Sequence, residues 1–507
     1  MNSLNQKKIK KKKLFHEKTV LGVDFGTSYS VISYKYNKTI NIINNSKKEY
    51  LIPSIVYFQK NKITVGKKIE NMLILDPENT VISIKRLIGH SLEYIKNTYP
   101  NLPYKLEFDS IKKEVLICTK YQKITPSEIA GKILRYLLNK SSNFLNKSIY
   151  GIVLTIPAYF DHIQRKNIKH ASEIAGIKIL RLLNEPTAAA IAYGLHFKKD
   201  TTILVYDLGG GTFDVSILKV SNGIFEVLAI NGDSQLGGDD FDDILAKYLF
   251  SKFRFSFKKY HSSYRYFLKC ANQIKMLLSK SDSIIFKIYN KTFKINRNKF
   301  NSLINHLVEK TIFLCKKTIK QSCIKIKQIN EIILVGGSTL IPYIQKKVEI
   351  TFQRKILNSI NPRKVVAIGA GIHAVNLVEP NFNNNQMILL DVLPISLGIE
   401  IMGGIMECII PANTTLPISK KKFFTTFRDN QKSIIVHILQ GEKLYVKDCK
   451  SLAKFSFGNI PLKPAGKVYI SVTFEIDTNG ILNVFVKENT KHLKMKLELD
   501  SNSILSH

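Results

Sequence analysis

Two segments of this 507-residue chain place an aspartate, glycines and hydroxyl side chains directly after a short apolar run. The first is Asp24-Phe25-Gly26-Thr27-Ser28, and the second runs from Asp207 through Gly209-Gly210-Gly211 to Thr212 and Asp214. Glycines let backbone N–H groups approach a phosphate closely, and the hydroxyls add donors. The first aspartate of each segment can hold a magnesium ion through water. Two such turns that face each other across a cleft would clamp a nucleotide.

Each turn needs a buried strand before it. The apolar runs 20–23 and 203–206 predict these strands. Because the two copies lie far apart in the chain, we interpret them as a duplicated lobe rather than a short tandem repeat. Another strand, 332–335, leads into a further glycine turn at Gly336-Gly337-Ser338-Thr339.

The elements between these turns are also predictable. Thr125 and Glu128 form a capping box around Pro126, which predicts the start of a helix. A buried strand at 152–157 precedes a helix from about Phe160 to Ala175 that Gly176 ends. Residues 240–325 are predicted to be mostly helical, with a short strand pair near 283–295.

After about residue 375 the pattern changes. Residues 380–386 form a polar break, and Leu389-Leu390-Asp391-Val392 is short and apolar. From 394 to 498 only strand patterns occur, which predicts a separate β-sandwich. No apolar stretch approaches the roughly 20 residues of a membrane span, so we expect no membrane association.

The net charge of +37 raises the question of nucleic-acid binding. The lysines are spread over the whole chain and accompany many Ile and Asn residues, a pattern typical of codon bias toward A and T. We therefore expect no specific nucleic-acid binding and only weak adhesion at low salt. The basic run at 7–13 is interpreted as part of a solvated tail, 1–18. Six cysteines without a C-x-x-C pair favour a reduced, cytoplasmic location.

Several motifs resemble those of the DnaK-type chaperones, the heat-shock family of about 70 kDa. They are the segments 207–214, Asn184-Glu185-Pro186-Thr187, Ile84-Lys85-Arg86-Leu87-Ile88-Gly89, 335–339 and 389–392. The match is collinear from about residue 20 to 498. Residues 91–93, 99–104 and Phe424-Thr425-Thr426-Phe427 are most similar to the HscA branch, which serves iron–sulfur cluster assembly.

The resemblance implies an α/β actin-like ATPase domain at 19–378, a linker at 379–393 and an all-β peptide-binding sandwich at 394–498. A helical lid would follow in the family, and we expect it to be absent here, with 499–507 as a tail. The implied cofactors are ATP or ADP with Mg²⁺, and K⁺ is compatible. The implied partners are a J-domain co-chaperone and an iron–sulfur scaffold protein as client.

Other functions fit parts of this pattern. A general folding chaperone of the DnaK type, or a partly decayed relative without a lid, has the same motifs. A sugar kinase shares the ATPase fold, but the linker and the sandwich argue against it.

ATP hydrolysis needs a placed water and neutralised phosphate charge. Asp24 and Asp207 are the predicted magnesium-shell carboxylates, Lys85 the partner of the transferring phosphoryl group, and Glu185 the residue that orients the water. Without the resemblance, Lys85 would be a solvated charge and Glu185 a helix cap. Thr212 completes the predicted catalytic set. The predicted nucleotide-binding residues are Gly26, Thr27, Ser28, Tyr29, Gly209, Gly210, Gly211, Asp214, Gly237, Lys275, Ser279, Gly336, Gly337 and Ser338.

The adenosine side departs from the family pattern. Asn272 stands where an acidic residue is usual, and Met276 and Leu340 stand where arginines are usual. Arg363 replaces an aspartate at a helix start, a position where the helix dipole disfavours a cation. These changes predict altered nucleotide affinity.

In the sandwich, an extended peptide would add to a strand edge while its side chains enter a pocket. Met402 and Phe427 are expected to arch over the peptide. For Ile434 and Val436 a place in the core is an equal alternative, because alternating apolar residues usually face a core. The predicted cleft comprises Ile399, Ile401, Met402, Phe424, Thr426, Phe427, Gln431, Ile434 and Val436. The linker residues Leu389, Leu390, Asp391 and Val392 are expected to dock on the ATPase domain when ATP is bound.

Overall fold

The computed structural model describes residues 18–45, 49–100, 102–110, 114–194, 200–253, 262–289, 291–380, 387–488 and 494–497. The predicted tails and most of the polar break at 380–386 lie outside these ranges.

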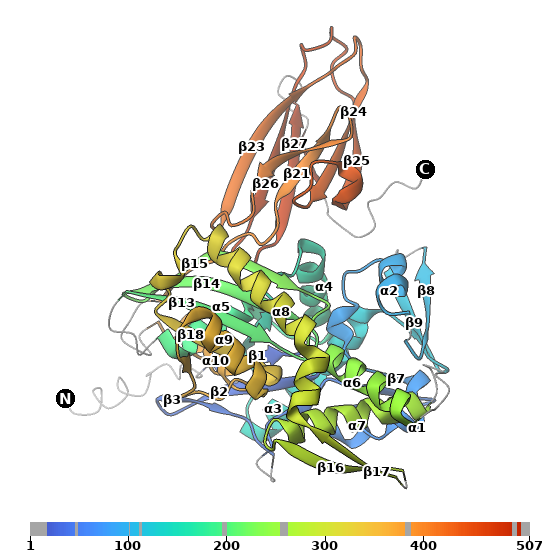
Figure 1. Ribbon diagram of the computed structural model, residues 1–507. Coiled ribbons are helices and arrows are strands. Elements are labelled where there is room, and N and C mark those ends of the chain that lie inside the picture. Colours follow the sequence, from blue (N-terminus) through green and yellow to red (C-terminus); the bar gives the residue numbers. More distant parts are fainter. Residues whose placement is uncertain are drawn as a thin grey trace, which may run out of the picture.

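Two mixed sheets with the same strand order form the larger part of the molecule (Figure 1). The first has the order β12-β11-β1-β2-β3, and the second has the order β19-β18-β13-β14-β15-β20. In both, an antiparallel meander joins two parallel strands, so the predicted duplication of a lobe is confirmed. The strands are β1 (Val20–Phe25), β2 (Tyr29–Tyr36), β3 (Thr39–Ile42), β4 (Ile52–Pro53), β11 (Gly151–Ile156), β12 (Ile179–Asn184), β13 (Thr201–Leu208), β14 (Phe213–Ser221), β15 (Ile224–Asp233), β18 (Glu331–Val335), β19 (Ile356–Leu357) and β20 (Ile388–Leu390).

Two helices, α5 (Glu185–Gly194) and α10 (Val365–Val378), cross between the sheets and share one apolar cluster with strands of both lobes. Their approach is very close. A Cβ on Gly369 of α10 would fall 1.7 Å from the carbonyl oxygen of Ala188 in α5, so only glycine fits there. Each lobe has its own larger core on the outer face of its sheet.

The helix ends follow local capping chemistry. The capping box of Thr125 and Glu128 is present at the start of α3 (Pro126–Leu145), as predicted. The next helix, α4 (His162–Ile174), begins two residues later than expected, because Asp161 forms its own capping box with Gln164. Gly176, with φ of +67°, follows that helix.

Smaller elements surround the sheets. The predicted helical region at 240–325 with a strand pair is present as α6, α7, β16, β17 and α8. These and the remaining elements are α1 (Met72–Leu75), α2 (Leu92–Thr98), α6 (Gly238–Phe253), α7 (Ser262–Leu278), α8 (Arg297–Gln321), α9 (Pro342–Phe352), β5 (Val56–Gln59), β6 (Lys62–Val65), β7 (Thr80–Val81), β8 (Lys105–Asp109), β9 (Glu114–Cys118), β10 (Lys123–Ile124), β16 (Ser283–Ile288) and β17 (Lys291–Asn296), with short 3-10 turns between them.

The C-terminal part is a sandwich of two antiparallel four-stranded sheets, ordered β22-β21-β24-β25 and β23-β26-β27-β28. It stands at one end of the two lobes (Figure 1). One apolar cluster fills it, and Ile163 of α4 reaches into that cluster from the first lobe. Its strands are β21 (Leu397–Ile401), β22 (Ile405–Ile410), β23 (Ile418–Thr425), β24 (Ser433–Gln440), β25 (Lys450–Gly458), β26 (Tyr469–Ile476), β27 (Leu482–Glu488) and β28 (Lys494–Leu497).

Candidate functional site: a cavity between the lobes and a sandwich cleft

A cavity of about 770 Å³ lies between the two lobes, where the three glycine turns meet. Most of the predicted nucleotide-site residues line it. They are Asp24, Gly26, Thr27, Ser28, Tyr29, Lys85, Glu185, Asp207, Gly209, Gly210, Thr212, Lys275, Ser279, Gly336, Gly337 and Ser338. This volume is in the range of small-molecule and cofactor sites.

Three predicted residues lie behind the lining instead. A Cβ on Gly237 would fall 2.5 Å from the carbonyl oxygen of Gly210, so Gly237 lets two backbone segments touch. The Gly211 carbonyl faces Arg86. Asp214 is buried and accepts a 3.1 Å hydrogen bond from the Tyr159 backbone N–H. Their part in the site is therefore to shape the turn, and direct contact with a ligand is not supported.

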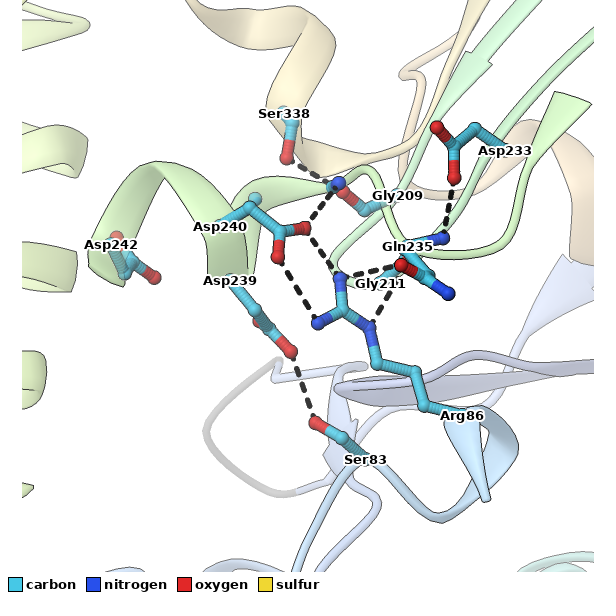
Figure 2. A network of polar contacts seen from close by, with 12 residues as sticks. Ser83, Arg86, Gly209, Gly211, Asp233, Gln235, Asp239, Asp240, Asp242 and Ser338 are labelled. Atoms are coloured by element: carbon cyan, nitrogen blue, oxygen red, sulfur yellow. Dashed lines mark hydrogen bonds and ion pairs between the residues drawn. The ribbon is translucent and has the colours of Figure 1, made fainter. Parts of the chain in front are cut away.

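The glycine turns are held against one another by backbone contacts. The Ser338 hydroxyl donates to the Gly209 carbonyl at 2.8 Å, and the Gly238 N–H donates to the same oxygen at 3.0 Å (Figure 2). The turn of the first lobe faces that of the second, since a Cβ on Gly210 would fall 2.0 Å from Ser28 Oγ. Backbone N–H groups of both lobes therefore border one cavity.

Lys85 and Glu185 form a buried ion pair at the cavity wall. Lys85 Nζ lies 2.8 Å from Glu185 Oε1, and Lys85 is only 3% exposed. Lys85 comes from the 3-10 turn Ile84–Arg86, whereas Glu185 begins α5. A buried charge needs such a partner because its desolvation is costly. The alternative of a solvated lysine is therefore excluded.

Carboxylates outnumber cations at this wall. Burial, and then the charge of Glu185, raise the pKa of Asp24 to about 7, although the positive charge of Lys85 opposes them. The same two causes raise the pKa of Asp214 to about 7 and that of Asp207 well above its usual value. Four carboxyl groups with one lysine form a site with excess negative charge, which a bound cation would relieve.

Arg86 joins the two lobes beside the cavity. Its Nε and Nη2 donate to the Gly211 carbonyl at 3.0 and 2.8 Å, and Nη2 lies 2.6 Å from Asp240 Oδ2 (Figure 2). Ser83 Oγ donates to Asp239 Oδ2 at 3.0 Å. Our sequence reasoning missed these partners. The sequence signal that could have identified them is the pair Asp239-Asp240 after two glycines. Acidic residues at this position are typical of the first turn of a helix.

The predicted adenosine side is built on α7. Lys275 Nζ donates to Asp242 Oδ2 and to the Gly238 carbonyl, both at 2.8 Å, and Asn272 donates to the same carboxylate at 2.8 Å. Ser279 donates to the carbonyl of Lys275 at 2.9 Å. Lys275 is thus neutralised within the protein and positioned by Asp242.

The predicted peptide-cleft residues divide by burial. Val436 and Ile399 belong to the sandwich core, at 1% and 4% exposure, and Thr426 is buried as well. For Val436 the alternative of a core residue therefore holds. Ile401, Phe424, Gln431 and Ile434 are partly buried, whereas Met402 and Phe427 are 78% and 59% exposed.

Gln431 fixes the loop that presents Phe427. Its Oε1 accepts from the Phe427 backbone N–H at 3.1 Å, and its Nε2 donates to the Ser433 carbonyl at 2.7 Å. Met402 follows β21 directly in the turn to β22. Two exposed apolar side chains on loop tips are therefore available to contact an extended segment.

The linker is part of the second lobe. Residues Ile388–Leu390 form β20, which pairs in parallel with β15, and Val392 is buried in the cluster between the sheets. Asp391 accepts a 2.7 Å hydrogen bond from Asn184, the last residue of β12. The segment thus touches both lobes before the chain enters the sandwich.

The sandwich also contacts the first lobe around α4. Lys450 Nζ lies 2.5 Å from Asp161 Oδ2, and the Leu482 backbone N–H donates to His162 Nδ1 at 2.9 Å. Arg165 donates to the Asn479 carbonyl at 3.2 Å. Burial would raise the pKa of Asp161, but Lys450 lowers it overall. These contacts join the N-terminus of α4 to one end of the sandwich.

Comparison with known proteins now identifies the class of protein. A family model described as Hsp70 protein matches residues 20–507. The chain therefore belongs to the Hsp70 family: it is an ATP-dependent chaperone with ATPase activity that binds nucleotide. The predicted resemblance and fold class are confirmed. Within the described ranges, none of the helices has the length and apolar character to span a membrane.

The chain is also similar to proteins named Chaperone protein HscA. The chain is 46% identical to the one from Buchnera aphidicola subsp. Schizaphis graminum over 491 residues, 97% of this chain and 80% of that protein. It is 44% identical to the one from Buchnera aphidicola subsp. Baizongia pistaciae over 502 residues, 98% of each. A Chaperone protein HscA homolog from Mannheimia succiniciproducens is 43% identical over 483 residues, 95% of this chain and 78% of that protein.

Proposed function

We propose that this chaperone captures and releases a segment of an iron–sulfur scaffold protein in the cytoplasm, with a J-domain co-chaperone as partner. The observation that supports coupling between the nucleotide site and the sandwich is the position of β20. This strand lies in the same sheet as β13, whose end bears Asp207, and it leads directly into the sandwich. The similarity to proteins named HscA supports the branch. We further propose the domain bounds 19–378, 379–393 and 394–498.

The residues at the cavity wall fit ATP or ADP with Mg²⁺. Asp24 and Asp207 would hold the ion through water, because hard cations prefer carboxylate oxygen and the excess negative charge favours binding. When bound, the ion neutralises phosphate charge. Lys85 stabilises the charge that develops on the transferring phosphoryl group, and Glu185 orients the attacking water through a carboxylate oxygen. The backbone N–H groups of the glycine turns orient the phosphates.

The test is ATP turnover by the full chain. It is measured alone, with the J-domain partner, with the scaffold protein, and with both. We expect turnover to rise most with both, and a scrambled scaffold segment to give no increase. Equal stimulation by the scrambled segment and the scaffold would contradict a dedicated iron–sulfur role and favour a general folding chaperone.

A further inference from the structure

The cations that line the cavity differ in what holds them. In the described part of the chain these cations are Lys67, Lys85, Lys275, Lys280 and Arg363. Carboxylates pair with the first three, and Lys280 is exposed at the rim. Arg363 is half-buried, and its guanidinium forms no ion pair with any described carboxylate. An unpaired, half-buried cation that faces a cavity is available to a ligand.

The guanidinium of Arg363 lies against the glycine turn of the second lobe. The position of a Cβ on Gly337 would be 3.1 Å from Arg363 Nε and 3.7 Å from Nη2. Gly337 therefore leaves the space that the arginine occupies. The Arg363 backbone N–H donates to Asn361 Oδ1 at 2.9 Å, which fixes the chain at this point.

The charge of the same guanidinium also acts on the first lobe. Burial raises the pKa of Tyr29, and the positive charge of Arg363 opposes that rise. Tyr29 begins β2 directly after the first phosphate turn. Arg363 therefore lies beside the glycine turn of the second lobe, and its charge acts on the residue that follows the first phosphate turn.

The place of Arg363 in the chain is unfavourable without an anion. It comes two residues before α10, where the partial positive charge of the helix N-terminus repels a cation. A polyphosphate would satisfy both the helix end and the guanidinium, which binds phosphate oxygens in a fork geometry.

We propose that Arg363 is a nucleotide-binding residue whose guanidinium contacts the polyphosphate of bound ATP or ADP. The proposal rests on the proposed nucleotide site and is independent of the client and of hydrolysis. It assigns the anion-binding charge on this side of the cavity to a residue at the start of α10, since Leu340 after the glycine turn has no charge.

Equilibrium binding of ADP, AMP and adenosine to the full chain tests this proposal. We expect Arg363→Ala to weaken ADP binding about tenfold or more, AMP binding less, and adenosine binding by less than twofold. Arg363→Lys should retain part of the ADP affinity, whereas Arg363→Gln should resemble the alanine variant. The matched control is Lys364→Ala, which removes the same charge one residue later. Lys364 lies outside the lining, with its Nζ 4.3 Å from the ring centre of Tyr50.

Several results of these binding measurements would contradict a contact between Arg363 and phosphate. An equal loss for adenosine and ADP would mean that Arg363 stacks on the base, which contradicts a phosphate contact. Unchanged ADP affinity, or the same loss in Lys364→Ala, would also overturn it. If the unmodified chain binds neither ADP nor ATP, the proposed nucleotide site itself is contradicted. This result differs from all the others. Melting of the ligand-free variants checks folding, and the near-isosteric Arg363→Gln variant serves if the alanine variant does not fold.

Discussion

The chemistry of the site depends on a few residues whose charge the protein does not neutralise. Lys85 and Glu185 neutralise each other, but an acidic group remains beside them, with Asp207 and Asp214 buried and Asp24 partly buried. The sequence motifs predicted these residues because each follows a strand or a turn with a distinctive glycine pattern. Arg86 was identified only as part of a motif. Its contacts with Gly211 and Asp240 depend on how two distant segments pack.

We expect Lys85→Ala to leave ATP binding nearly intact and to lower the rate of hydrolysis by two or more decades. The loss corresponds to about 3 kcal/mol of transition-state stabilisation, because the cation would no longer face the phosphoryl group. Single-turnover hydrolysis with prebound ATP measures this step. The matched control is Lys67→Ala, which removes a cavity-lining lysine whose side chain is mostly exposed. An unchanged single-turnover rate would remove Lys85 from the mechanism.

The raised carboxyl pKa values predict a pH dependence with a definite sign. Asp24 has a pKa of about 7 when folded, above its usual value of 3.8, so the folded state binds an extra proton between these values. The stability that this proton contributes is fully present below about pH 4. It is lost as the pH rises through 7.

Mg²⁺ competes with that proton, so its affinity should rise as the pH increases from 6 to 8. Melting of the full chain with and without Mg²⁺ across this range measures both effects. Asp24→Asn should flatten the metal-free pH dependence and weaken the Mg²⁺ effect. A variant with the unmodified pH profile would show that Asp24 does not titrate in this range.

At the scale of elements, the predictable features were local. Capping boxes, glycine turns and apolar runs predicted β1, β11, β13, β18, the start of α3 and the extent of α4 within about two residues. The start of α4 was missed because Asp161 competes with the earlier position as a cap. The burial of Val436 and Ile399 could not be decided from alternation, since one strand face contacts the core and the other can contact a client.

The strand β20 should couple the nucleotide lobe to the sandwich. We expect Leu389→Asp with Leu390→Asp to abolish peptide stimulation of the ATPase and to leave basal turnover within about twofold. Both side chains are partly buried, and Leu389 packs against the cluster between the sheets, so a charge there would detach the strand. Steady-state ATPase with and without a scaffold segment measures this.

The control for β20 is Ile388→Asp, because Ile388 is in the same strand but is 48% exposed. It should keep stimulation. If the double variant is stimulated as strongly as the unmodified chain, β20 does not transmit the signal.

For the whole molecule, the family similarity and the motif order predicted two bodies joined by a linker. They did not predict how these bodies contact each other. The contacts join residues more than 280 positions apart, such as Asp161 with Lys450 and His162 with Leu482. Such pairs follow no local sequence pattern, so they become visible only in the structure.

The pair of Lys450 and Asp161 should hold the sandwich against the first lobe. Lys450→Met should shift the molecule toward separated domains, as measured by energy transfer between dyes on the two parts. The interaction is partly buried, so we expect about 1–2 kcal/mol, a five- to thirtyfold change in the docking equilibrium. Lys447→Met, in an exposed turn of the sandwich, is the control and should not change it.

Asp161→Asn keeps a capping oxygen for α4 while removing the charge. The double variant with Lys450→Met should shift the docking equilibrium no further than either single variant, because the two residues act as a pair. Additive losses would show that they act independently and would contradict a direct ionic contact.

The position of β20 at the end of its sheet has a consequence for solubility. With β20 in place, β15 is an inner strand, because its neighbours are β14 and β20. Whenever the linker leaves, the main chain of β15 around residues 224–226 loses its partner groups and becomes a free edge. A free edge can pair with a strand of another molecule, which is a known route to aggregation. The linker therefore also covers the edge of β15, and any step of the chaperone cycle that detached it would expose an aggregation-prone edge for as long as it stayed detached.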